Sequence, residues 1–80
     1  MSTSKHNWLQ LTQGMIPVAR IVLLMHANSA GSKRLLKSKK YQLVDMTGGQ
    51  QRETIIILDN QSLVITSYSL LELQRKLGEK

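Results

Sequence analysis

Apolar and polar residues alternate in a way that predicts a small β-sheet in the middle of the chain. Two runs rich in β-branched residues, 54–58 and 62–66, are separated by Asp59-Asn60-Gln61, a sequence typical of a hairpin turn. A shorter apolar pair, Leu43-Val44, precedes the polar loop 47–52, whose paired glycines supply the positive φ angles of a tight reversal. The three runs predict an antiparallel meander whose exposed tip carries amides and one arginine.

Three further extended segments precede this meander. Leu9-Gln10-Leu11, which follows Trp8, alternates as a short edge strand does. Met15-Ile16-Pro17-Val18 is also expected at an edge, because proline cannot donate a ladder hydrogen bond. Arg20-Ile21-Val22-Leu23-Leu24-Met25 is a continuous apolar run after one charge, which predicts a central strand buried on both faces or a strand at an interface.

A short basic helix is predicted between these strands and the meander. Residues 26–32 are expected to form a loop in which Ser29 or Ser32 caps a helix over about Lys33–Lys40. Such a short helix is marginal in water, so we expect its two leucines to dock on the sheet.

A second helix is predicted at the C-terminal end of the chain. Ser69 and Glu72 have the spacing of a capping box, and Tyr68 and Leu73 occupy the positions of a hydrophobic staple. Gly78 is expected to end the helix. The complete pattern predicts an α+β fold: a small antiparallel sheet with one short basic helix and one C-terminal helix.

The chain length limits the organisation to one domain. Of the 80 residues, we expect 1–7 to be a disordered tail and 8–80 to be a single domain. A chain this short buries a modest core, so self-association is a common source of stability. The chain has no cysteine, no apolar run long enough to span a membrane and no apolar segment of a signal peptide near Met1, so we expect a cytoplasmic protein.

Charge is distributed unevenly along the sequence. The net charge is +6, and residues 1–44 contain seven Lys or Arg and no acidic residue. Five of these cations fall within residues 33–40. Such asymmetry favours a polyanionic partner, either nucleic acid or an anionic membrane surface, although a solvated basic face is the simpler alternative. Two leucines offer little apolar area for a membrane, so we expect no membrane partner.

Residues that could support catalysis are few. His6 and His26 have no cysteine partner and no cluster at metal-ligand spacing, and no nucleophile has an evident base. Asp45 and Asp59 could be paired carboxylates, but aspartates at strand ends more often bond local amides. We therefore expect a protein that is not an enzyme and that uses no metal or other cofactor.

The polar loop and the basic helix are the candidate binding residues. Gln50, Gln51 and Arg52 offer amides and a guanidinium that can contact base edges or phosphates of DNA. Lys33 and Arg34 begin the basic helix, where each neutralised phosphate would add salt-sensitive affinity.

An ordered set of short segments runs through the chain and carries a family resemblance. The segments are Ala19-Arg20-Ile21-Val22, Ser29-Ala30, Lys33-Arg34-Leu35-Leu36, Leu43-Val44-Asp45, Thr47, Gly49, Ile56-Ile57-Leu58-Asp59 and Leu63-Val64-Ile65-Thr66-Ser67. With them, the chain resembles the RemA-like family of bacterial extracellular-matrix regulators over roughly Met15–Leu77.

The resemblance implies a homo-oligomeric ring of about seven or eight copies that binds duplex DNA along a basic rim and activates biofilm-matrix genes. It assigns DNA contact to the arginine before the Ile-Val strand, here Arg20, and to two adjacent arginines in the glycine loop. This chain departs from the family at the loop pair, where it has Gln50 and Gln51, while Arg52 lies one residue further on.

Our leading hypothesis is a DNA-binding transcriptional regulator in which Arg20, the loop residues 50–52, Lys33 and Arg34 contact DNA. The glutamine replacements motivate an alternative from another class, a ring-forming protein-interaction module that has lost specific DNA binding. A small basic ring that binds RNA is a third alternative.

Overall fold

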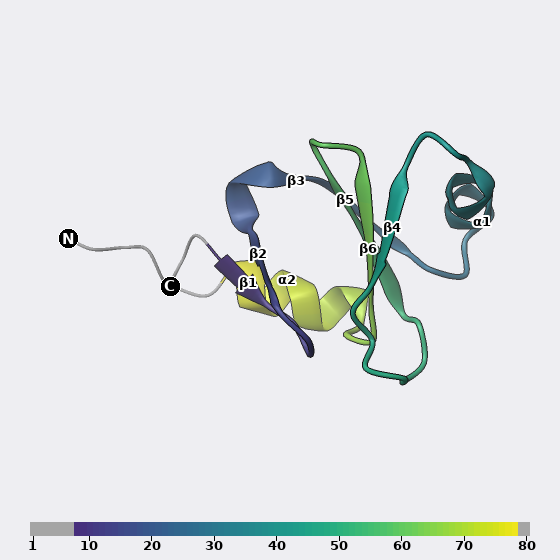
Figure 1. The fold of residues 1–80 in the computed structure, drawn as a ribbon. Helices are drawn as coiled ribbons and strands as arrows, with labels where there is room; N and C mark the ends of the chain where they lie inside the picture. The colour runs from purple at the N-terminus through teal and green to yellow at the C-terminus, as the bar shows by residue number, and fades with distance from the viewer. Residues whose placement is uncertain (1–7, 79–80) are drawn as a thin grey trace.

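The apolar runs of the sequence become strands, and the polar segments become turns. The computed structural model describes residues 8–78, so the tail expected at residues 1–7 lies outside the described residues. In chain order the elements are β1 (Trp8–Gln10), β2 (Met15–Pro17), the 3-10 turn η2 (Val18–Arg20), β3 (Ile21–His26), α1 (Ala30–Lys37), β4 (Gln42–Asp45), β5 (Thr54–Leu58), β6 (Ser62–Thr66) and α2 (Leu70–Gly78). They confirm the predicted α+β class (Figure 1).

The main sheet has four strands in the order β3-β5-β6-β4. β5 pairs antiparallel with β6, which confirms the predicted hairpin, but β4 pairs parallel with β6 and not with β5. The meander prediction is therefore wrong in the position of β4. The reason is burial: β6 keeps Leu63, Val64 and Ile65 almost fully inside, so it lies between two strands, whereas β4 has exposed residues and suits an outer position.

β3 is the other outer strand of this sheet. It pairs antiparallel with β5, from Ile21 opposite Leu58 to His26 opposite Thr54. The prediction that this strand is central and buried on both faces is wrong for a single subunit, because the side chains of Val22 and Leu23 are exposed: Val22 is 63% and Leu23 48% exposed. A continuous apolar run does not distinguish a strand buried inside one chain from one covered by another chain.

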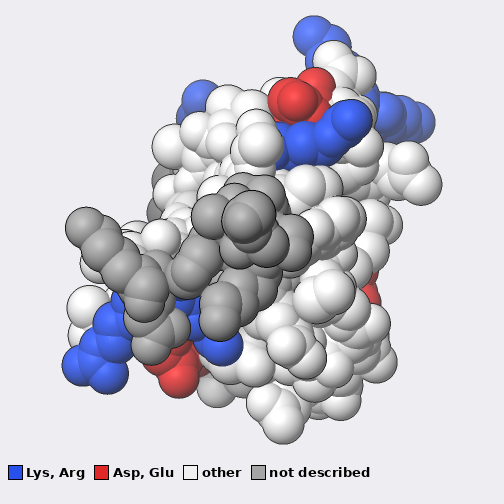
Figure 2. Space-filling view, turned by 90° about the vertical axis from the view of Figure 1, so that its left-hand side faces the viewer, with Lys and Arg blue, Asp and Glu red and all other residues white. Residues whose placement is uncertain are grey.

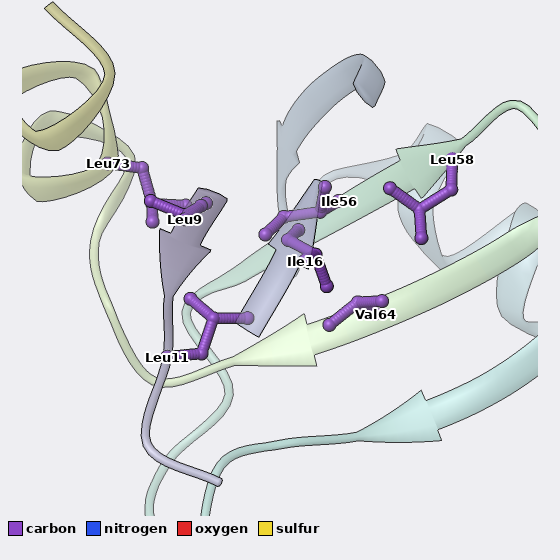
Figure 3. Close-up of a cluster of buried hydrophobic side chains, with 7 residues drawn as sticks. All are labelled: Leu9, Leu11, Ile16, Ile56, Leu58, Val64 and Leu73. Carbon is purple, nitrogen blue, oxygen red and sulfur yellow. The ribbon is translucent and has the colours of Figure 1, made fainter. Parts of the chain in front are cut away.

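The two faces of the sheet carry separate apolar cores. Ile56, Leu58 and Val64 point to one face, which is covered by the β1–β2 hairpin and by Leu73 of α2 (Figure 3). Strand β2 contains Pro17 and lies in a two-stranded sheet, as its expected edge position requires. Each fully buried leucine or isoleucine contributes about 1.5–3 kcal/mol relative to an exposed one, so these side chains fix the hairpin and α2 on this face.

The opposite face is covered by α1. Its core consists of buried Ala27, Ile55, Leu63 and Ile65, with Leu35 and Leu36 among the partly buried side chains packed against it. In Figure 1, α1 lies on one side of the sheet while β1, β2 and α2 lie on the other. The predicted docking of the basic helix through its leucines is confirmed.

Helix α1 begins earlier than the sequence predicts. Ser29 is its N-cap, and the Ser29 hydroxyl oxygen accepts a hydrogen bond of 3.1 Å from the backbone N–H of Ser32. This bond makes residues 30–32 the first helical turn and not part of the loop, despite Gly31. The helix ends at Lys37, so Lys39 and Lys40 lie in the turn before β4.

Helix α2 begins with the predicted capping box. The Ser69 N–H donates to Oε1 of Glu72 at 2.8 Å, and the Glu72 N–H donates to Oγ of Ser69 at 3.1 Å. Tyr68 and Leu73 pack in the same core cluster, as a hydrophobic staple does. Local sequence signals were sufficient to place this helix.

Candidate nucleic-acid interface

The glycine loop between β4 and β5 is held in one conformation by local hydrogen bonds. Gly48 and Gly49 adopt φ angles of +67° and +88°, the left-handed region that favours glycine, as predicted. Oδ1 of Asp45 accepts from the backbone N–H of Thr47 at 2.9 Å and from its hydroxyl at 2.7 Å. Thr47 is buried, so the loop has a fixed base, while residues 50–52 at its far end are exposed.

The pKa of Asp45 reports on this hydrogen bonding. The backbone N–H of Thr47 lowers the pKa most, its hydroxyl lowers it further, and the positive charge of Arg52 adds a smaller effect in the same direction. Desolvation opposes them without reversing the shift. The carboxylate is therefore ionised at neutral pH and holds the loop that presents Arg52.

Lys33 and Arg52 come together in space, although 19 positions separate them in the sequence. The connection is the backbone hydrogen bond of 3.0 Å from the Ala27 N–H to the Glu53 carbonyl, which places the start of α1 beside the end of the glycine loop. Both cations line one pocket of about 230 Å³, together with Ala27, Asn28, Leu36, Ile55 and Ile65. Arg34, Gln50 and Gln51 are exposed nearby in the chain and do not line the pocket.

Arg20 lies at the other end of the sheet. It ends η2 immediately before β3, and its backbone carbonyl accepts a 2.9 Å hydrogen bond from the Asp59 N–H. Nη1 of Arg20 is 3.6 Å from Oδ1 of Asp59, with both side chains more than half exposed. The structure therefore does not bring Arg20 to the loop residues, and it places a carboxylate beside the arginine.

The basic side chains are concentrated on the α1 side of the molecule. Five of the nine Lys and Arg residues described belong to α1 or to the turn that follows it, and this segment contains no acidic residue: Lys33, Arg34, Lys37, Lys39 and Lys40. Figure 2 views the molecule from the side away from α1, where uncharged residues make up most of the described surface and Lys and Arg appear in a few separate groups near its edges. A polyanion would therefore meet the strongest positive potential along α1.

Sequence reasoning missed the pocket and the position of Asn28 in it. The apolar run 55–57 predicted burial but not which face each isoleucine would take, and the order of the strands decides which residues face α1. A usable signal was the small side chain of Ala27 after a strand of large residues, because a small residue beside bulky neighbours leaves space.

The two aspartates considered for catalysis lie apart, and His6 lies outside the described residues. Asp45 ends β4 beside the glycine loop, whereas Asp59 follows β5 at the opposite end of the sheet, so the two carboxylates are not paired. Within residues 8–78 no group of three or more His, Cys, Asp or Glu side chains is placed to hold a metal ion. In the same range, none of the helices has the length and apolar character needed to cross a membrane.

Comparison with known protein families agrees with the ordered segments in the sequence. A family model described as RemA-like, extracellular matrix regulatory protein A-like, matches residues 9–77. The match contains every element from the second residue of β1 to the penultimate residue of α2, including the glycine loop and the pocket. The chain therefore belongs to the RemA-like family.

Proposed function

We propose that the protein is a non-enzymatic transcriptional regulator that binds duplex DNA as a homo-oligomeric ring in the bacterial cytoplasm and controls biofilm-matrix genes. The observation that carries this proposal is the run of five cations on α1 and its following turn, a segment that contains no acidic residue, in a member of a family of regulators. Lys33, Arg34 and Arg52 would contact phosphates, and Gln50 and Gln51 would contact the backbone or base edges.

The two ends of the subunit would make separate contributions to DNA binding. Lys33 and Arg52 lie at the loop end of the sheet, and Arg20 lies at the turn end, beside Asp59. A ring of subunits repeats both ends around its rim, so one duplex could meet the loop end of one copy and the turn end of another. Arg20 would have to exchange Asp59 for a phosphate, which lowers its net contribution.

Unpaired strand edges support the ring. Among the described residues, β3 and β4 each have only one neighbouring strand, and both expose large apolar side chains: Val22 and Leu23 on β3, and Leu43, which is 49% exposed, on β4. Exposed apolar edge strands are sites of association. A contact between β3 of one copy and β4 of the next joins two different surfaces, and such contacts form a closed ring when the rotations between neighbouring copies add up to a full turn.

A salt series with charge variants tests DNA binding. Lys33→Gln and Arg52→Gln should each weaken binding of a labelled duplex and reduce the slope of log affinity against log salt concentration by about 0.9. Arg75→Gln, an exposed cation on α2, is the matched control and should leave the slope unchanged. Equal losses in all three variants would show non-directional charge attraction and contradict the proposed interface.

A second candidate function is a ring that docks a protein partner and no longer binds specific DNA. Gln50 and Gln51, in place of the two cations that the family resemblance leads us to expect, favour it. A stable oligomer with no duplex binding at low salt would select this function. Competition with single-stranded RNA in the same assay would identify an RNA-binding ring.

A further inference from the structure

A pocket of about 230 Å³ opens between the start of α1 and the loop end of the sheet. Beneath it lies a cross-strand pair, Ile55 of β5 and Ile65 of β6, with no exposed surface, so the accessible apolar lining comes from Leu36 and Ala27. Leu36 forms a wall from α1, and the methyl group of Ala27 leaves the space that a larger side chain would fill. An apolar group that entered this space would contact Leu36 and Ala27 above the buried isoleucines.

The remaining lining residues give the pocket a positive polar side. Lys33 and Arg52 are exposed cations, Asn28 adds an amide, and none of the seven lining residues is a carboxylate. An arginine presents a planar fork that matches a carboxylate, and a lysine adds a point charge. The combination of an accessible apolar wall with two cations favours a ligand that has an apolar body and one anionic head.

The volume limits the size of that body. A dry cavity of about 150 Å³ is enough to bind benzene. The pocket here, at about 230 Å³, therefore holds one aromatic ring or a short acyl chain, and it falls below the usual range of about 300–1,000 Å³ for drug-sized ligands. A whole nucleotide is too large to be enclosed.

We propose that this pocket binds a small amphipathic carboxylate, with its apolar body against Leu36 and Ala27 and its carboxylate between Lys33 and Arg52. If these two cations contact DNA, as the proposed function holds, the bound ligand neutralises them and competes with phosphate. The ligand would then act as an antagonist of DNA binding, which couples the regulator to a small metabolite.

Benzoate and benzamide form a matched pair of probes, because they share the ring and differ in the charge. In a titration of the full-length protein followed by methyl NMR, benzoate should shift the methyl signals of Ala27, Leu36, Ile55 and Ile65 saturably, and benzamide should bind more weakly. Methyl signals that stay in place at saturating benzoate, or equal affinity for both probes, would overturn the proposal.

Charge variants test the position of the head group. Lys33→Gln should weaken benzoate binding by about two- to fivefold, while Lys37→Gln, one turn along the same helix and outside the pocket lining, should not. Equal affinities in the two variants would overturn the placement of the carboxylate. Both lysines are exposed, so neither change should disturb folding.

A duplex-binding assay with and without benzoate separates this proposal from the function on which its consequence rests. Weaker DNA binding at saturating benzoate would support the antagonism, and unchanged DNA binding would overturn it. If the methyl signals shift but the protein binds no duplex even without benzoate, the proposed DNA-binding function is contradicted. The proposed ligand site is then still supported.

Discussion

Arg20 and Arg52 lie at opposite ends of the ladder that joins β3 to β5. Ile21, which follows Arg20, is opposite Leu58, and His26 is opposite Thr54, two residues after Arg52. At about 3.3 Å per residue, the seven steps along the chain from Arg52 to Asp59 separate the two ends by about 23 Å. The two arginines of one subunit therefore cannot hold the same phosphate, and their contributions to DNA binding should be close to additive.

The carboxylate beside Arg20 should weaken its contact with DNA. Asp59→Asn removes the charge 3.6 Å from Nη1, so duplex affinity should rise by about two- to fivefold at low salt. Fluorescence anisotropy with a labelled duplex measures this gain. The control is the same substitution in an Arg20→Ala background, where the gain should disappear. An equal gain in both backgrounds would mean that Asp59 acts on the overall charge and not on Arg20.

Arginines at the two exposed glutamines of the loop should strengthen DNA binding. The double variant Gln50→Arg and Gln51→Arg adds two cations beside Arg52, and the salt slope should steepen by about 0.9 for each new phosphate contact. The matched control adds the same charge at exposed glutamines elsewhere, Gln10 of β1 and Gln74 of α2. Equal steepening in the two double variants would contradict a loop interface.

A charge on the β3 edge should disrupt self-association without unfolding the subunit. Val22→Lys alters a side chain that is 63% exposed, so the free energy of unfolding of the isolated subunit should change by no more than about 0.5 kcal/mol. Light scattering should show smaller assemblies, and circular dichroism should show an intact fold. Leu71→Lys, at a position 61% exposed on α2, is the control. An intact assembly in Val22→Lys, or dissociation in Leu71→Lys, would contradict the edge contact.

The glycine loop should lose its hydrogen bonds in acid. In the folded protein the pKa of Asp45 lies below its ordinary value of 3.8. The ionised carboxylate therefore stabilises the loop fully at pH values above the pKa that Asp45 has in the unfolded chain. This stabilisation is lost as the pH falls through the folded pKa. In an NMR titration, the amide signals of Thr47 and Gly49 should shift with a midpoint below 3.8. Arg52→Gln should move the midpoint upward, because the positive charge of Arg52 lowers the pKa of Asp45. A midpoint at or above 3.8 in the unmodified protein would contradict the loop geometry.

Elements with local signals were predictable from the sequence. Ser69 and Glu72 are three residues apart, and the side chain of each accepts a hydrogen bond from the backbone N–H of the other. The hairpin turn at residues 59–61 joins two strands that pair directly. Such features depend on a few neighbouring residues, so the sequence pattern contains most of what determines them.

The order of the strands depends on how much apolar surface each strand buries relative to the others, which no local sequence pattern contains. β4 and β5 are consecutive and joined by a glycine loop, but β6 lies between them because it buries more apolar surface. The proximity of Lys33 and Arg52 has the same origin, since it follows from the pairing of Ala27 with Glu53 across the β3–β5 end of the sheet. The sequence therefore identified the individual candidate residues. It did not predict that they divide between two ends of the subunit.

Native mass spectrometry of the unmodified protein, with and without duplex DNA, tests the central claim most directly. We expect one closed oligomer of about seven or eight copies without DNA, and the same oligomer with a bound duplex when DNA is added at low ionic strength. A protein that remains monomeric at all concentrations and forms no complex with the duplex would contradict the proposed DNA-binding ring.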